Sequence, residues 1–264
     1  MKTALTIAGS DSGAGAGIQA DLKTFAAHRV YGTSAITAIT AQNTLGVTNI
    51  LPLPTDLVTA QIEAIVSDIG VHAAKTGMLA TPAIVEAVAA AVDAFDIPLV
   101  VVDPVMVAKG GARLLDAEAE ATIRTELLRR AFVVTPNVFE AEVLAGMRVT
   151  SLSDQREAAR RIHALGPKAV VVKGGHLTGA EAIDVLFDGR EFTELRSPRI
   201  ETRHTHGTGC TFASAITANL ALGHGLVDAV RQAKTYLAGT MRNGVPLGRG
   251  HAPLDHFWNW APRT

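Results

Sequence analysis

The chain has 264 residues, of which 48% are hydrophobic and 19% are charged, and its formal net charge is −1. This is the composition of a well-packed protein with a sizeable core, and the balanced charge argues against nucleic acid or an anionic membrane as a partner. A single cysteine excludes an internal disulfide framework, and because no apolar run is long enough for a signal peptide or a membrane span, the expected compartment is the cytoplasm.

Short β-type runs alternate with longer helical stretches along the chain. We expect strands at residues 4–8, 34–40, 99–103, 132–135 and 169–173, and helices at 19–28, 55–67, 82–95, 116–130, 138–145 and 154–165. A hairpin follows, 182–187 with 191–195, and then two helices at 208–222 and 227–242. Several strands are continuous Val/Ile runs, which favours a parallel sheet covered on both faces. The sequence therefore predicts one three-layer α/β domain over residues 1–264 with a mostly parallel central sheet.

Polar or glycine-rich segments follow five of the expected strands and the short apolar run 71–74. They are residues 10–13, 42–44, 75–78, 103–104, 136–137 and 173–176. In open α/β sheets ligands bind beyond the carboxyl ends of the strands. We therefore expect these six segments to surround one site.

The run Gly207-Thr208-Gly209-Cys210 precedes an Ala-rich, proline-free segment, so a helix should begin at about Thr208. The free N–H groups and the positive end of the dipole make such a helix start an anion-binding site. The pKa of the Cys210 thiol should be lowered there, because the site favours the thiolate. The run therefore indicates phosphate chemistry beside a thiolate, although a small buried hydrophobic side chain explains Cys210 equally well.

Asn137 and Glu140 stand three residues apart at an expected helix start. Oxygen ligands of this kind suit Mg²⁺ when substrate phosphates complete its coordination. A capping box uses the same spacing, and spacing alone favours the cap. Asp103 ends a buried strand, and Lys173 before two glycines suits nucleotide phosphates, although each residue alone is a weak signal.

Other motifs exclude function classes. The glycine loop 13–17 lacks the G-x-G-x-x-G spacing, and no G-x-x-x-x-G-K-[ST] run is present, which excludes a dinucleotide fingerprint and a P-loop. His204, His206 and His251 lack the spacing of known metal ligands, so a transition-metal site is not expected. No basic cluster with interleaved aromatic residues is present, which argues against nucleic-acid binding.

Eight segments together resemble the hydroxymethylpyrimidine/phosphomethylpyrimidine kinases of thiamine biosynthesis, which belong to the ribokinase-like superfamily. They are residues 5–24, 31–47, 73–79, 101–111, 134–144, 171–177, 204–216 and 248–257, and they occur in family order. The resemblance implies a ribokinase-like fold and a transfer of phosphoryl from ATP, with Mg²⁺, to 4-amino-5-hydroxymethyl-2-methylpyrimidine and then to its monophosphate. It also suggests a homodimer.

The resemblance assigns roles by position in this sequence. Gln42 is implied to bind the pyrimidine edge, and the rest of that pocket is implied to be Gly9, Asp21, Thr40 and Met78. The resemblance implies that the metal and phosphates are bound by Asp103, Asn137 and Glu140, and that the ATP phosphates are bound by Lys173, Thr208 and Asn137. Gly207, Gly209 and Cys210 would form the anion hole, with Cys210 either as the base for the substrate hydroxyl or as a positioning group.

Two departures and two alternatives stay open. The chain has Ala14 in a loop that is usually all glycine, and Gly110-Gly111-Ala112 where Ser-Gly-Asp is usual, which puts a covering role of that loop in doubt. Pyridoxal kinase activity, alone or beside the pyrimidine activity, is one alternative reading. A non-catalytic pyrimidine-binding protein is the other, although the intact anion-hole run opposes it.

Overall fold

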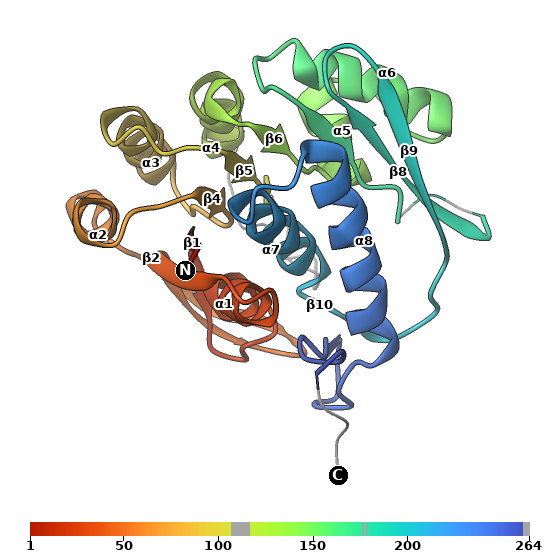
Figure 1. Ribbon diagram of the computed structural model, residues 1–264, viewed down its shortest axis with the longest axis horizontal. Helices are drawn as coiled ribbons and strands as arrows, with labels where there is room; N and C mark the ends of the chain where they lie inside the picture. The colour runs from red at the N-terminus through yellow and green to blue at the C-terminus, as the bar shows by residue number, and fades with distance from the viewer. Residues whose placement is uncertain (107–116, 176, 178, 261–264) are drawn as a thin grey trace.

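The computed structural model describes residues 1–106, 117–175, 177 and 179–260 (Figure 1). Within them a nine-stranded sheet has the order β3-β2-β1-β4-β5-β6-β7-β8-β9. The pairs from β2 to β7 are parallel, and β3, β8 and β9 pair antiparallel with the preceding strand. The strands are β1 (Thr3–Asp11), β2 (Tyr31–Asn43), β3 (Gly46–Pro52), β4 (Ala73–Thr76), β5 (Val100–Val102), β6 (Val133–Val134), β7 (Val170–Val172), β8 (Glu181–Phe187) and β9 (Phe192–Pro198).

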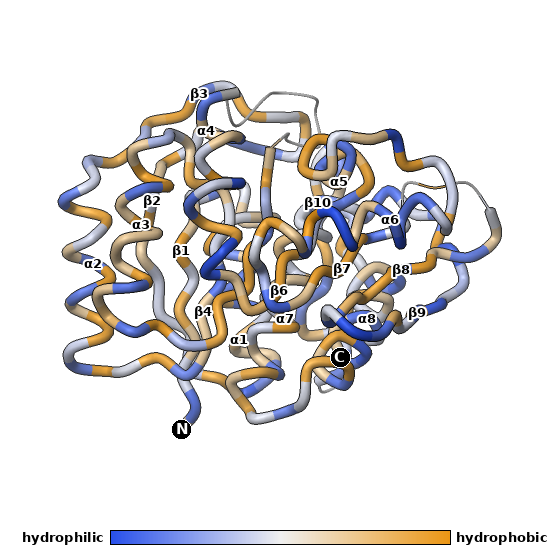
Figure 2. The backbone as a smooth tube through the Cα atoms, turned by 90° about the horizontal axis from the view of Figure 1, so that it is seen from above, coloured by the Kyte–Doolittle hydropathy of each residue, from blue (hydrophilic) through white to orange (hydrophobic). Residues whose placement is uncertain are grey.

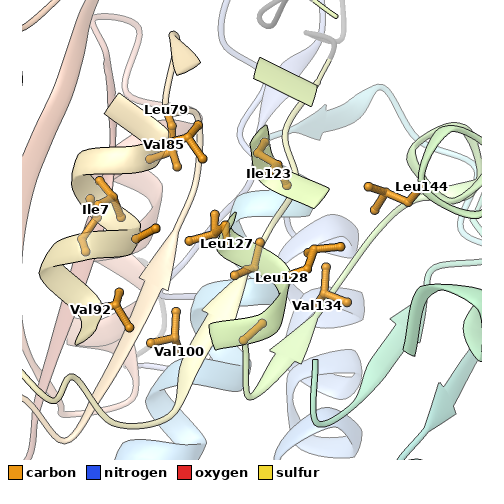
Figure 3. Close-up of a cluster of buried hydrophobic side chains, with 14 of the residues drawn as sticks. Ile7, Leu79, Val85, Val92, Val100, Ile123, Leu127, Leu128, Val134 and Leu144 are labelled. Carbon is orange, nitrogen blue, oxygen red and sulfur yellow. The ribbon is translucent and has the colours of Figure 1, made fainter. Parts of the chain in front are cut away.

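Helices cover both faces of this sheet (Figure 1). One face carries α1 (Gly17–Ala27), α7 (Thr208–Ala221) and α8 (Leu226–Arg242), and its core contains Phe25, Val101 and Phe212. The other face carries α2 (Thr55–Asp68), α3 (Pro82–Ala94), α4 (Ala117–Thr122), α5 (Val138–Ala145) and α6 (Leu152–His163). Figure 3 shows the second core, where Ile7 and Val100 from strands meet Val85 and Leu127 from helical segments. The expected three-layer α/β architecture is therefore confirmed.

The sequence pattern explains why the helices lie where they do. Along α2 the tube in Figure 2 alternates between hydrophobic and hydrophilic segments, as in a helix with one face on a sheet and one in solvent. Thr81 caps α3 by accepting from the N–H of Ile84, with Pro82 in the first turn. No helix in the described ranges is both long and apolar enough to cross a membrane.

The expected elements are present with boundaries that differ by one to a few residues, and the differences have physical causes. The helix expected at 116–130 is a succession of α4, a π-helical turn (Ile123–Leu127) and a 3₁₀ turn (Leu128–Arg130), and its expected start at Asp116 lies outside the described residues. The sequence pattern did not predict β3, an edge strand that is largely exposed and therefore lacks a continuous apolar run. It also did not predict β10 (His204–His206) or β11 (Ala252–Pro253), a two-stranded pair outside the main sheet.

The strand order places a crevice at one edge of the sheet. From β1 the chain passes to β2 on one side and returns to β4 on the other, so the order reverses at β1. Ligands bind at such reversals, beyond the carboxyl ends of the strands. Asp11, Asp103 and Lys173 lie at or directly after the ends of β1, β5 and β7.

Candidate active site

A cavity of about 920 Å³ lies at these strand ends. It is lined by the expected residues Gly9, Thr40, Gln42, Met78, Asp103, Asn137, Glu140, Lys173, Gly207, Thr208, Gly209 and Cys210. The topology therefore brings segments that lie about 200 residues apart in the sequence together at one cavity. Asp21 is the one expected site residue that does not line it.

The start of α7 forms one wall of this cavity. Gly207 precedes the helix with φ 81°, and a Cβ there would stand 1.8 Å from the carbonyl oxygen of Gly15. Only glycine fits this left-handed turn and this close approach of two backbones. No side chain caps the helix, so its first turn presents backbone N–H groups and the positive dipole end to the cavity. The expected anion-binding geometry is present.

The expectation of a lowered Cys210 pKa is wrong. Burial raises the pKa of the thiol to about 11, and Asp21 and Asp103 add to this rise. The Lys75 ammonium and a hydrogen bond from the backbone N–H of Gly17 act in the opposite direction and do not outweigh it. A local helix start favours thiolate, but the surrounding protein removes the water that would solvate its charge. The resting site therefore holds a protonated thiol at neutral pH.

Asp103 and Lys173 form an ion pair beside the anion hole. Lys173 Nζ lies 3.1 Å from Asp103 Oδ1, and a Cβ on Gly209 would be 3.4 Å from Asp103 Oδ2 and 3.7 Å from Lys173 Nζ. Burial lowers the pKa of Lys173, but Asp103 and Glu140 outweigh it, so the net pKa is raised. Lys173 therefore keeps its positive charge next to the first turn of α7.

Asn137 and Glu140 form a complete capping box at the start of α5. Asn137 N–H donates to Glu140 Oε2 at 2.7 Å, and Glu140 N–H donates to Asn137 Oδ1 at 3.0 Å. The Glu140 side chain also accepts from the N–H of Met106. Burial raises the pKa of Glu140 to about 7, with Asp103 adding to the rise and Lys173 opposing it. The carboxyl group is thus held in place, but its surroundings disfavour its negative charge.

The opposite wall carries the residues expected at the pyrimidine. The Thr40 hydroxyl has one proton, which it shares between Gln42 Oε1 at 3.1 Å and the carbonyl of Ser10 at 2.9 Å, and this contact helps to orient the Gln42 amide. Gly9 N–H donates to the carbonyl of Met78 at 3.1 Å, and a Cβ on Gly9 would lie 2.5 Å from Met78 Cε. Gly9 therefore gives the Met78 side chain the space to form an apolar wall.

The expectation that Asp21 belongs to this pocket is not met. Its side chain is fully buried behind the wall and accepts hydrogen bonds from Thr6 at 2.6 Å, from Ser214 at 2.6 Å and from Lys75 at 2.9 and 3.0 Å. Three donor groups make four hydrogen bonds to the carboxylate, which is the pattern of a buried charge that needs compensation. Its partner Lys75 lines the cavity instead.

Two pairs of ionisable side chains at the site were not predicted as site residues. Asp11 accepts from the N–H groups of Gly13, Gly15 and Ala16, and its Oδ2 lies 2.8 Å from His206 Nε2. This pair links the glycine loop to the segment before Gly207. The sequence offered the polar end of β1 and a histidine beside Gly207, but nothing in it pairs the two. No cluster of three or more metal-ligating side chains occurs in the described residues.

The second pair joins α8 to β8. Lys234 Nζ is 2.7 Å from Asp184 Oδ2, and both residues line the cavity with Pro198, Leu237 and other residues. Asp184 Oδ1 accepts from Gly174 N–H at 2.9 Å, which ties β8 to the turn after β7.

Comparisons with known proteins show the family to which the chain belongs. A family model described as phosphomethylpyrimidine kinase matches residues 11–255. The hydroxymethylpyrimidine/phosphomethylpyrimidine kinase of Bacillus subtilis is 49% identical over 96% of this chain and 94% of its own length. The thiamine biosynthesis bifunctional protein ThiED of Geobacter sulfurreducens is 51% identical over 96% of this chain, which spans about half (52%) of that protein.

The solved structures include a close match in fold. The pyridoxal kinase from Staphylococcus aureus in complex with AMP-PCP and pyridoxal has a TM-score of 0.91 and 39% identity, covering 98% of this chain and 95% of that one. The chain therefore belongs to the phosphomethylpyrimidine kinase family of small-molecule kinases, with a ribokinase-like fold.

Proposed function

We propose that the chain transfers the γ-phosphoryl group of ATP to the hydroxymethyl group of 4-amino-5-hydroxymethyl-2-methylpyrimidine, and then a second phosphoryl group to the resulting monophosphate. One observation carries the proposal: a single cavity joins the Thr40–Gln42 wall to the uncapped start of α7 and to the Asp103–Lys173 pair. A heteroaromatic acceptor at the first feature would present its oxygen to a phosphoryl group held at the other two.

The residues divide the work of the transfer between them. Gln42 Oε1 is used by Thr40, so the Gln42 amide would offer its N–H donors to a pyrimidine nitrogen. The N–H groups at Thr208–Cys210 and the Lys173 ammonium would stabilise the charge that spreads over the phosphoryl oxygens. Asp184 and Lys234 would lie along the nucleoside.

Cys210 would take the proton of the acceptor alcohol. The substrate O–H bond breaks as its oxygen forms a bond to the γ-phosphorus, the proton passes to the thiolate form of Cys210, which is the minor form at neutral pH, and ADP leaves with the electrons of the broken P–O bond. The same sulfur accepts from Gly17 N–H, which holds it between the starts of α1 and α7. The alternative is that Cys210 only positions the acceptor.

The donor set fits Mg²⁺ bound mainly through substrate. Burial raises the pKa of Glu140 and the Asp103 carboxylate adds to the rise, and a cation between the two carboxylates relieves that repulsion. Asn137 Oδ1 and Glu140 Oε2 already accept hydrogen bonds, so few protein oxygens are left for the ion. We propose that Asp103, Asn137 and Glu140 hold Mg²⁺, partly through water, and that it neutralises charge on the ATP phosphates.

Pyridoxal kinase activity is the alternative, and the fold match to a pyridoxal kinase favours it specifically. A coupled ADP-release assay with hydroxymethylpyrimidine, its monophosphate and pyridoxal as acceptors separates the two. We expect turnover of both pyrimidines. Turnover of pyridoxal alone would refute the proposal, and no turnover of any acceptor would indicate a binding protein.

We also propose, from the resemblance alone, that the protein is a cytoplasmic homodimer. Light scattering on the purified protein would give the molar mass, for which 27.6 kDa is the value of one chain. A mass of one chain over the micromolar range would contradict the dimer.

A further inference from the structure

The Lys75–Asp21 pair is fully buried directly beneath the anion hole. Lys75 Nζ lies 3.0 and 2.9 Å from the two Asp21 oxygens, and both side chains have no exposed surface. Thr6 and Ser214 donate to the same carboxylate. Asp21 thus ties together β1, β4, α1 and α7. Burying an ion pair costs the free energy of desolvating two charges, so such a pair is weak evidence for a role in stability. A role in the neighbouring site is the other explanation for the position of this pair.

The pair lies on the face of α7 that carries Cys210. Ser214 is four residues after Cys210, which places the two side chains on one face of the helix, one turn apart. Lys75 and Cys210 both line the cavity. A second lysine–carboxylate pair, Lys173 with Asp103, lies beside Gly209 in the first turn of α7. Cys210 therefore faces two lysines, each held by its own aspartate.

We propose that Lys75, oriented by Asp21, is the counter-charge for Cys210 when its sulfur is ionised, and so a positioning residue of the phosphoryl transfer. Asp21 would keep the lysine charged and fixed, so that no solvent needs to reorganise when the charge on the sulfur changes. This rests on the proposed function, since it gives Cys210 an ionised state during the reaction.

The electrostatics of the cluster support this geometry. Burial lowers the pKa of Lys75, but Asp21 outweighs it, with Cys210 and Asp103 adding, so its net pKa is raised and the ammonium persists. At Cys210 the thiolate is favoured by Lys75 and by the N–H of Gly17 and disfavoured by Asp21 and Asp103. Cys210 in turn raises the pKa of Lys173. Lysine and aspartate therefore act on the sulfur in opposite directions.

Alkylation of the thiol tests the proposal without any substrate. The chain contains one cysteine, so the rate of iodoacetamide addition followed by mass spectrometry reports on Cys210 alone. Lys75→Met should raise the thiol pKa by about one unit, which leaves about tenfold less thiolate but a more nucleophilic one, and alkylation at pH 8.5 should slow about threefold. Asp21→Asn should accelerate it by a similar factor.

Controls separate charge from packing. Lys234→Met removes a partly buried lysine from an aspartate in the same cavity and should leave the alkylation rate within a factor of about 1.5. Lys75→Arg keeps the charge and should restore most of the rate. If Lys75→Met does not fold, the isosteric Asp21→Asn variant still gives the sign. Shifts of the same sign in the Lys75 and Asp21 variants, or no shift in either, would overturn the proposal.

Activity assays keep this proposal distinct from the proposed function. If the wild-type chain phosphorylates no pyrimidine, the proposed function fails while the alkylation result still stands. If it does phosphorylate both acceptors, Lys75→Met should lower kcat with the alcohol acceptor and leave KM for it within about twofold. A rise in KM with unchanged kcat would place Lys75 in substrate binding and overturn the positioning role.

Discussion

Replacing Cys210 with alanine should affect the two proposed reactions very differently. The first acceptor is an alcohol, whose proton must be removed as its oxygen attacks. The second is a phosphate monoester with a second pKa near 6, so at pH 7.5 it is already deprotonated and needs no base. If Cys210 is the base, Cys210→Ala removes a group that only the first reaction uses.

The structure sets the magnitude. A pKa of about 11 leaves about one thiol in three thousand ionised at pH 7.5. General base catalysis contributes about 10²- to 10⁴-fold, so kcat with the alcohol should fall by that factor, or about 3–5 kcal/mol. With the monophosphate only packing beside Gly17 is lost, and the fall should be less than about tenfold. Below the thiol pKa, the thiolate fraction rises tenfold for each unit by which the pH increases. A plot of log kcat against pH for the wild type with the alcohol should therefore have a slope near one from about pH 7 to 9.

A coupled ADP-release assay on both acceptors, run across this pH range with wild type and Cys210→Ala, measures all three quantities. The wild-type rate with the monophosphate should be nearly flat above about pH 7. Equal losses with both acceptors, together with a flat pH profile for the alcohol, would refute the base role and leave Cys210 as a positioning group. Retained activity with both acceptors would remove it from the chemistry altogether.

Three further substitutions test other parts of the site and the fold. Gln42→Ala should raise KM for the pyrimidine about 3- to 10-fold with kcat little changed, since one hydrogen bond is lost; an unchanged KM would remove Gln42 from the pocket. Glu140→Gln keeps a side chain able to cap α5, so the free energy of unfolding should fall by less than about 1 kcal/mol. The Mg²⁺ concentration needed for half-maximal activity should rise several-fold. A large loss of stability with an unchanged Mg²⁺ dependence would show that Glu140 acts only as a helix cap. Burial lowers the pKa of His256 to about 4, so as the pH falls the unfolded chain binds a proton before the folded chain does. The free energy of unfolding should therefore be unaffected by this group above about pH 6.5 and should fall by about 3 kcal/mol as the pH drops to 4. His256→Gln should flatten that decline in melting experiments, and an unaltered slope would assign the decline to other groups.

The elements of the fold could be predicted because their signals are local. Val/Ile runs identify β5, β6 and β7, and the apolar spacing of residues 82–94 identifies α3. Parallel topology then brings the polar strand ends together without further information, which is why Asp103 and Lys173 could be placed at one site from their position in the sequence. The edge strand β3 was not predicted because many of its residues are exposed to solvent, so its sequence has no continuous apolar run.

Charge pairing could not be predicted, because it depends on residues that meet only in the folded chain. Lys75 and Asp21 are 54 positions apart, and Lys234 and Asp184 are 50 apart. The sign of the shift at Cys210 failed for the same reason. The helix start that favours thiolate can be read from four residues, whereas the burial that opposes it comes from elements spread over the whole chain.

The capping box at Asn137 and Glu140 shows that a structural role and a functional role can be the same contact. Sequence spacing set the two interpretations against each other, and the structure contains the cap in full. Yet the cap is what holds the Glu140 carboxyl group in a position where burial and the repulsion of Asp103 raise its pKa. A metal site built on mobile side chains would relax away from such repulsion. Because a helix start fixes Glu140, the repulsion remains until a cation, with its phosphates, removes it.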